Sequence, residues 1–155
     1  MGTPFKSFPD LCVGLAGAIT RGKAILDGEI VCLDKDGCSQ FNNLLFRRGT
    51  ARFCAFDLLW LDGRDLRELR LIERKRELRK LVPANFAHLL YVDHVESEGE
   101  RLFELACDRD LEGIVAKHRD SRYSIEDGNP AWVKIKNPRY SQIVGRDELF
   151  ERVAT

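Results

Sequence analysis

The sequence lacks several features that would place it in a specialised class of protein. No apolar run approaches the length of a transmembrane helix, and no signal-peptide pattern opens the chain. The five cysteines are odd in number and include no C-x-x-C pair, which favours reduced thiols over a disulfide framework or a zinc site. The three histidines are scattered and show no metal-ligand spacing. We therefore expect a cytoplasmic protein with no membrane partner.

The chain also lacks an excess of positive charge. Lys and Arg together number 25, and Asp and Glu together number 25. Proteins that bind nucleic acid unaided usually carry a basic surplus, because Lys and Arg contact the phosphates. If this chain acts on DNA, a local basic patch or another domain must therefore supply most of the affinity for DNA. At 155 residues, 44% of them hydrophobic, the chain is long enough for one globular domain with a substantial core.

Helical and strand patterns interleave along the chain without regular strand–helix–strand alternation. Helices are predicted at 8–19, 69–82, 99–110 and 145–154 from apolar spacing and flanking proline. A hairpin is predicted over 24–41 with its turn at Asp34–Gly37, and further strands at 51–61, 89–95, 112–118 and 131–137. These patterns predict an α+β domain with antiparallel β-sheets flanked by helices.

Strand alternation isolates two unusual groups of polar residues. Asp27 and Glu29 share a strand face with aliphatic residues, although buried charge is costly unless it is paired or bound to a cation. Lys134 and Lys136 share a face of a later strand, where they repel each other unless an anion such as a phosphate lies between them. Each group taken alone is better explained as part of an ordinary solvent-facing strand.

Four motifs occur together and in order: "ILDGEIVCLD", "FCAFDLLWLDG", "LEGIVAK" and "WVKIK". Together they resemble the motif series of ATP-dependent DNA ligases of the bacterial type, which are covalent nucleotidyltransferases. The resemblance covers nearly the whole chain from about residue 8. It implies that residues 1–155 are a single, N-terminally incomplete adenylation domain of the ATP-grasp-like nucleotidyltransferase fold. Residues 142–155 would form a helical tail in the place of the OB-fold domain that usually follows.

The resemblance also implies roles for individual residues. Glu29 would contact the nucleotide ribose or help to hold Mg²⁺, and Phe56 would stack on the adenine of ATP or AMP, unless it is a core residue. Glu112 would coordinate Mg²⁺. Lys134 and Lys136 would neutralise the α-phosphate and the charge that develops as pyrophosphate leaves.

Three further residues of the motifs have less definite roles. Asp27 and Asp57 are interpreted as structural hydrogen-bond acceptors. Lys117 closes the "EGIVAK" motif, but strand alternation places it opposite Glu112, and its role stays open.

The nucleophile of such ligases is the lysine of a K-x-D-G motif, which these 155 residues do not contain. Three hypotheses follow: an adenylation domain completed by a segment from elsewhere, a non-catalytic nucleotide- or polyphosphate-binding remnant, and an enzyme that seals nicks already carrying AMP. Nicked double-stranded DNA is the implied partner, held weakly by this chain alone. A missing segment would also leave a sheet edge unpaired, which predicts a homodimer or domain-swapped assembly.

Overall fold

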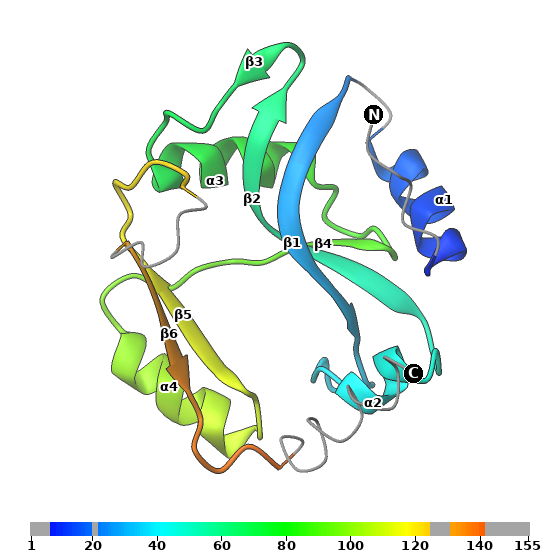
Figure 1. Ribbon diagram of the computed structural model, residues 1–155, viewed down its shortest axis with the longest axis vertical. Helices are drawn as coiled ribbons and strands as arrows, with labels where there is room; N and C mark the ends of the chain where they lie inside the picture. Colours follow the sequence, from blue (N-terminus) through cyan, green and yellow to red (C-terminus); the bar gives the residue numbers. More distant parts are fainter. Residues whose placement is uncertain (1–6, 20–21, 125–130, 142–155) are drawn as a thin grey trace, which may run out of the picture. The chain divides into compact units, whose positions relative to one another are not determined.

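The structure is a computed structural model that describes residues 7–19, 22–124 and 131–141 (Figure 1). The chain divides into two compact units. Unit 1 comprises the chain up to His94 together with Lys117–Ala131, and unit 2 comprises Val95–Ala116 and the chain from Trp132 onward. The helix predicted at 145–154 lies outside the described residues. None of the described helices is long and apolar enough to cross a membrane.

Unit 1 is built around a four-stranded sheet whose central strand is β2. β2 (Ala51–Leu61) pairs antiparallel with β1 (Ala24–Cys32) along its length and with β3 (Arg64–Asp65) at its end. It also pairs in parallel with the short β4 (Leu89–Tyr91), a pairing that the sequence patterns did not predict. The α+β class with antiparallel strands is confirmed.

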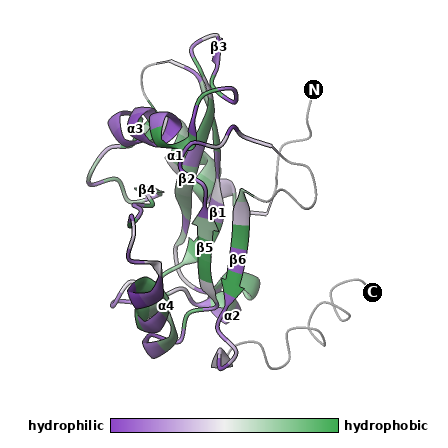
Figure 2. Cartoon of the chain, turned by 90° about the vertical axis from the view of Figure 1, so that its left-hand side faces the viewer, coloured by the Kyte–Doolittle hydropathy of each residue, from purple (hydrophilic) through white to green (hydrophobic). Residues whose placement is uncertain are grey.

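Two helices cover this sheet. α1 (Pro9–Ala18) contacts β2 and β4, and α3 (Leu71–Leu81) contacts β2. In Figure 2 the outer side of α3 is mostly hydrophilic, as expected for an amphipathic helix on a sheet. The core of unit 1 joins both helices to the sheet through buried side chains of Ala18, Ala55, Leu58, Leu66, Leu78, Val82 and Leu89.

The hairpin predicted over 24–41 is wrong in its second half. The return strand is reduced to a single bridge between Leu33 and Ser39, and the chain then enters the short helix α2 (Phe41–Leu45). The turn itself forms where it was predicted, since the Asp34 carboxylate accepts hydrogen bonds from the backbone N–H of Asp36 and Cys38. After the turn, the Gln40 N–H donates back to the carbonyl oxygen of Cys32, and β2 takes the place beside β1.

Unit 2 contains the helix α4 (Gly99–Asp108) and a two-stranded sheet of β5 (Gly113–Lys117, with Lys117 counted in unit 1) and β6 (Trp132–Lys136). Both strands carry hydrophobic residues, which Figure 2 shows in green. Val115 and Val133 are nevertheless 51% and 53% exposed within the structure. Unit 2 therefore has much less of a core than unit 1.

Candidate functional site

The end of the β5–β6 sheet brings together two of the residues that the sequence singled out. Lys134 Nζ lies 2.8 Å from Glu112 Oε1, and both side chains are partly exposed. Lys136 is exposed on the same strand as Lys134 and forms no ion pair with another described residue. The lysines and the carboxylate thus form one exposed group of opposite charges.

Gly113 explains why Glu112 reaches Lys134. Its φ of +145° lies in a region that favours glycine, and a Cβ there would lie 2.1 Å from the carbonyl oxygen of Ile135. The backbone of β5 can approach β6 this closely only without a side chain. Glu112 itself precedes β5, so counting strand faces from Glu112 along β5 is unreliable.

Asn137 fixes the end of β6 to the residues before β5, and sequence reasoning missed it. Its backbone N–H donates to the carbonyl oxygen of Glu112 (2.8 Å), and its side-chain Nδ2 donates to that of Leu111 (3.0 Å). The residue is buried, at 4% exposure. The sequence alone gave no signal for it, because its burial, and hence its need for hydrogen-bond partners, is visible only in the structure.

In unit 1, Phe56 occupies a β-bulge. Asp27 pairs with Asp57 and Gly28 pairs with Ala55, so Phe56 is the extra residue of β2 at this point. Bulges re-aim side chains and occur often beside functional sites. Phe56 is half-buried, and Lys117 Nζ lies 4.2 Å from the centre of its ring. Burial lowers the pKa of Lys117, although the carboxylates of Asp57 and Asp27 oppose that shift.

Glu29 is exposed on β1, directly opposite Cys54 of β2. Burial raises the pKa of the Cys54 thiol, the Glu29 carboxylate raises it further, and Arg52 lowers it. Gly28 is held by close packing between the strands, since a Cβ there would lie 2.5 Å from the carbonyl oxygen of Cys54. This glycine therefore allows the close approach of the neighbouring strand.

The aspartates of the motifs do act as hydrogen-bond acceptors. Asp57 is fully buried and accepts from Arg74 Nε at 2.8 Å and from Arg74 Nη2 at 2.9 Å. Asp27 accepts from the Tyr123 hydroxyl at 3.0 Å. Burial and this hydrogen bond raise the pKa of Tyr123 to about 12. Arg74 and Tyr123 were missed, although Arg74 lies at a helix position between buried leucines.

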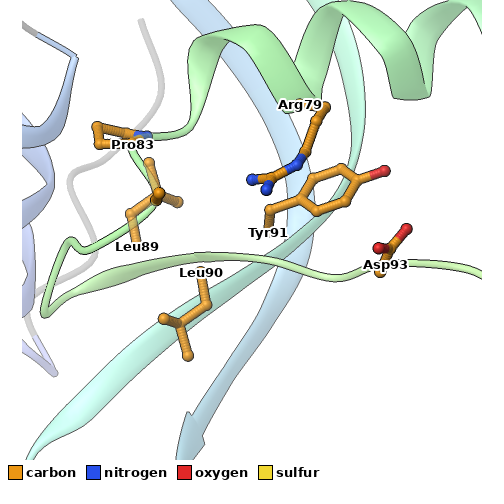
Figure 3. Close-up of a pocket in the computed structure, with 7 residues that line it drawn as sticks. Arg79, Pro83, Leu89, Leu90, Tyr91 and Asp93 are labelled. Atoms are coloured by element: carbon orange, nitrogen blue, oxygen red, sulfur yellow. The ribbon is translucent and has the colours of Figure 1, made fainter.

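One described hollow of unit 1, of about 250 Å³, involves none of these residues. It is lined by α3, β4 and the segments that follow them, and Figure 3 shows Arg79, Tyr91 and Asp93 there. The Arg79 guanidinium lies 5.1 Å from the Tyr91 ring centre, and Lys75 Nζ lies 4.6 Å from it. These cations already engage the aromatic ring, which indicates packing at the edge of the sheet. Among the described residues, no three His, Cys, Asp or Glu side chains form a metal-binding group.

Comparison with known proteins points to one family. Residues 3–136 match the family model described as ATP dependent DNA ligase domain. The multifunctional non-homologous end joining protein LigD of Mycolicibacterium smegmatis is 35% identical over 124 residues, which are 79% of this chain and 16% of that protein.

Solved structures give the same result. The ligase domain of Mycobacterium tuberculosis LigD is 36% identical with a TM-score of 0.70, over 83% of this chain and 42% of that one. A mycobacterial DNA ligase D complexed with ATP and MES is 37% identical with a TM-score of 0.67, over 79% of this chain and 40% of that one. The chain thus spans less than half of the length of each of these relatives.

Proposed function

Because this chain belongs to the ATP-dependent DNA ligase family, we propose that it binds adenine nucleotide and serves adenylate transfer during DNA strand joining. Repair of broken DNA in the cytoplasm is the proposed setting, since relatives such as LigD are named for non-homologous end joining. Nicked double-stranded DNA is the proposed substrate. The ATP-bound mycobacterial neighbour supports the choice of nucleotide.

The observation that carries this proposal is the group formed by Glu112, Lys134 and Lys136. Two lysines beside each other on a strand are suited to bind phosphate oxygens. In the free chain, Glu112 offsets the charge of Lys134 at 2.8 Å. We propose that nucleotide binding replaces this ion pair with contacts between both lysines and the phosphates. The lysines would then neutralise charge that develops on the α-phosphate.

The same group of residues contains a candidate ligand for Mg²⁺, Glu112. A partly exposed glutamate is a suitable ligand, because Mg²⁺ keeps several waters and is commonly held by one or two carboxylates together with substrate phosphates. We propose Glu112 as one ligand and Glu29, exposed on β1 of unit 1, as a second candidate. The ion would supply positive charge to the phosphates. The residues themselves would orient the nucleotide.

Unit 1 carries the proposed base and ribose contacts. The position of Phe56 at a bulge supports a re-aimed side chain rather than an ordinary core residue. Lys117 lies over one face of the ring, so the adenine would stack on the other. Glu29 would accept a hydrogen bond from the ribose. The contacts proposed for the two units can be tested separately.

A second candidate function rests on the absence of K-x-D-G from the printed sequence. Sealing of a nick that already carries AMP needs phosphate and metal contacts but no nucleophilic lysine. We propose this partial reaction for the 155-residue chain on its own. A purely nucleotide-binding, non-catalytic module is the remaining alternative. Two measurements separate these outcomes. An added AMP in the intact mass after incubation with ATP and Mg²⁺ would show self-adenylation. Without that adduct, joining of pre-adenylated nicks would show the partial reaction, and no joining would leave a nucleotide-binding module.

Titration calorimetry with ATP, with and without Mg²⁺, tests the site itself. Glu112→Ala should abolish the Mg²⁺ dependence, and Lys134→Ala should weaken binding of ATP more than binding of adenosine. Lys80→Ala is the matched control, because this exposed lysine likewise pairs with a glutamate, at 2.7 Å. If the unaltered chain and both site variants are equally unable to bind ATP, the proposed function is wrong.

We also propose that the chain pairs with a second copy. Within the described residues, β1 has a partner strand on one side only, and its Ile25 is 55% exposed. A strand edge of this kind offers unpaired backbone groups to another chain. Light scattering at increasing concentration should show a dimer. A monomer at the highest concentration would contradict this proposal and leave the nucleotide site unaffected.

A further inference from the structure

A second hollow of unit 1, of about 490 Å³, is lined by the start of α1, the segment between α2 and β2, and the residue before β4. A hollow of this size is large enough for a small molecule. Leu11 and Cys32 are its least exposed lining residues, at 3% and 4%. Arg47 and Thr50 line it from exposed positions. None of the residues proposed to bind nucleotide lines this hollow.

One lining residue has a buried polar atom without a partner. His88 lines the hollow, and its Nδ1 is buried and forms no hydrogen bond with a described residue. Buried polar atoms nearly always have a hydrogen-bond partner, so an atom of this kind points to a bound water or ligand. The hollow gives such a partner room beside the imidazole ring.

Packing holds this imidazole in place. A Cβ at Gly14 of α1 would lie 2.5 Å from Cγ and Cδ2 of His88, so only glycine lets the helix approach the ring this closely. The Phe86 ring lies edge-on to the imidazole, with the ring centres 6.4 Å apart. Nδ1 is bonded to Cγ on the side opposite Cδ2, so it points away from Gly14. A ring held on two sides keeps Nδ1 in one position, as a binding site requires.

The surroundings of the hollow favour a negatively charged ligand. The Arg47 guanidinium is exposed and forms no ion pair with a described residue. α1 begins at Pro9 without a side-chain cap, so the N–H groups of its first turn have no acceptor within the helix. The positive end of the helix dipole lies there as well. A guanidinium and N–H donors both suit the oxygen atoms of an anion.

The other lining residues restrict which anion fits. Asp10 is exposed beside the hollow, and its carboxylate disfavours a doubly charged group such as phosphate. Burial raises the pKa of the Cys32 thiol, so this group stays neutral and adds to the apolar lining of Leu11 and Ala51. A ligand with one negative charge and an apolar part matches this combination.

We propose that this hollow binds a small carboxylic acid. The carboxylate would accept hydrogen bonds from Arg47 and from Nδ1 of His88, and the apolar part would lie on Leu11 and Ala51. A carboxylate only accepts hydrogen bonds, so a neutral imidazole must carry its proton on Nδ1. A ligand that contacts both α1 and the start of β2 would stabilise unit 1. This site does not depend on the proposed function.

Titration of the isotope-labelled chain with sodium butyrate, followed by amide NMR spectra, tests the proposal. The backbone N–H resonances of Leu11 and Ala51 should shift and reach saturation. Butan-1-ol offers an apolar chain without the charge, and inorganic phosphate offers charge without the chain. Both should therefore bind about tenfold more weakly than butyrate.

Variants of the two proposed contacts sharpen the test. Arg47→Asn removes the charge but suits the left-handed backbone at this position, where φ is +54°. It should weaken butyrate binding about tenfold. His88→Phe keeps a flat ring without the nitrogen and should weaken binding similarly, whereas His88→Asn keeps a donor near the position of Nδ1 and should retain most of the affinity.

Arg48→Gln is the matched control, because this neighbouring exposed arginine lies over the Phe46 ring and does not line the hollow. It should leave butyrate affinity unchanged. Equal binding of butyrate and butan-1-ol would overturn the proposal, as would tighter binding of phosphate or unchanged butyrate affinity in Arg47→Asn. No shift with butyrate would also overturn it and leave an ordered water as the partner of His88 Nδ1. Arg47 is exposed, so its variant decides the question even if His88→Phe does not fold.

Discussion

The two units keep their charged residues in opposite surroundings. In unit 1, Asp57 and Arg74 form an ion pair with both side chains 0% exposed, beside a core of aliphatic residues. In unit 2, Glu112 and Lys134 form a pair of the same length, 2.8 Å, with side chains 36% and 55% exposed. The geometry of the two pairs is similar, but the solvent around them is not.

This contrast separates a buried, structural ion pair from one that is open to solvent. A buried pair is strongly destabilised when one partner is removed, because the remaining charge stays in the protein interior. A partly exposed pair contributes little to stability and exchanges partners readily. Glu112 and Lys134 can therefore change partners for a phosphate and a metal at small cost, whereas Asp57 and Arg74 cannot.

The largest expected effect comes from breaking the buried pair. Arg74→Ala should lower the free energy of unfolding by about 3–5 kcal/mol, because Asp57 would remain charged and buried without its partner. Arg74 also donates to the carbonyl oxygens of Leu69 and Ser121, which would be left without these donors. Chemical denaturation followed by circular dichroism measures the change in stability.

The double variant Asp57→Leu with Arg74→Met serves as the control for this prediction. It removes both charges and should be less destabilised than Arg74→Ala alone. Loss of an exposed ion pair lowers the free energy of unfolding by less than about 1 kcal/mol. If Arg74→Ala has an effect that small, the buried pair does not stabilise the fold more than the exposed pair does.

The second effect should be confined to unit 2. Gly113→Ala places a Cβ 2.1 Å from the Ile135 carbonyl oxygen and requires an unfavourable φ of +145°. We expect a cost on the order of 1–3 kcal/mol, with the β5–β6 sheet loosened and the ion pair between Glu112 and Lys134 broken. Hydrogen exchange should become faster at the backbone N–H of Asn137 and stay unchanged along β1 and β2.

Gly99→Ala is the matched control in the same unit, since a Cβ at Gly99 meets nothing within 4 Å. It should leave exchange in β6 unaltered. Faster exchange throughout unit 1 in Gly113→Ala would show that the two units do not unfold independently.

Much of this arrangement follows from sequence, and the exceptions have physical causes. Strand alternation singled out Asp27, Glu29, Lys134 and Lys136 from the sequence, because it needs only the period of two along a strand. It gave no assignment for Phe56, which is the extra residue of a bulge, and it did not predict the close approach of the strands at Gly113. Features of this kind depend on how two strands meet, which one strand's sequence does not encode.

Sequence patterns also did not predict the ion pairs and hydrogen bonds between residues that are distant in the chain. The partners Asp57 and Arg74 are far apart in the chain, and Asp27 and Tyr123 are farther apart still. Motif position identified both aspartates as acceptors, but only the fold shows which donor each one meets. The helix pattern assigned residues 69–82 correctly while leaving unexplained the arginine on its buried side.

The third effect concerns nucleotide binding in unit 1. Phe56→Ala should cost roughly 1–3 kcal/mol of ATP affinity if the ring stacks on adenine. Phe56→Leu keeps apolar volume without a flat face, so it should bind ATP more weakly while keeping most of the stability. Calorimetry and thermal unfolding measured on the same samples distinguish the two roles. Unchanged ATP affinity in both variants would assign Phe56 to the core.

The smallest expected effect uses Cys54 as a reporter for Glu29. Burial and then the Glu29 carboxylate raise the pKa of this thiol, and Arg52 lowers it. Glu29→Gln removes one cause of the raised pKa, so more thiolate forms at mildly alkaline pH and alkylation by iodoacetamide should speed up. Arg52→Gln should slow it. Peptide mapping by mass spectrometry follows Cys54 separately from the other four cysteines.

Comparing the rate of Cys54 alkylation with and without ATP tests whether Glu29 binds the ribose. If Glu29 binds the ribose, saturating ATP should protect Cys54 in the unaltered chain, because the nucleotide would cover the strand face that both residues share. Cys12, which is exposed on α1, provides the internal control and should react at the same rate with and without ATP. If ATP binds with measurable affinity but leaves Cys54 as reactive as before, Glu29 lies outside the nucleotide site. The ribose contact would then have to come from elsewhere, while the role of the exposed lysines in unit 2 would stand.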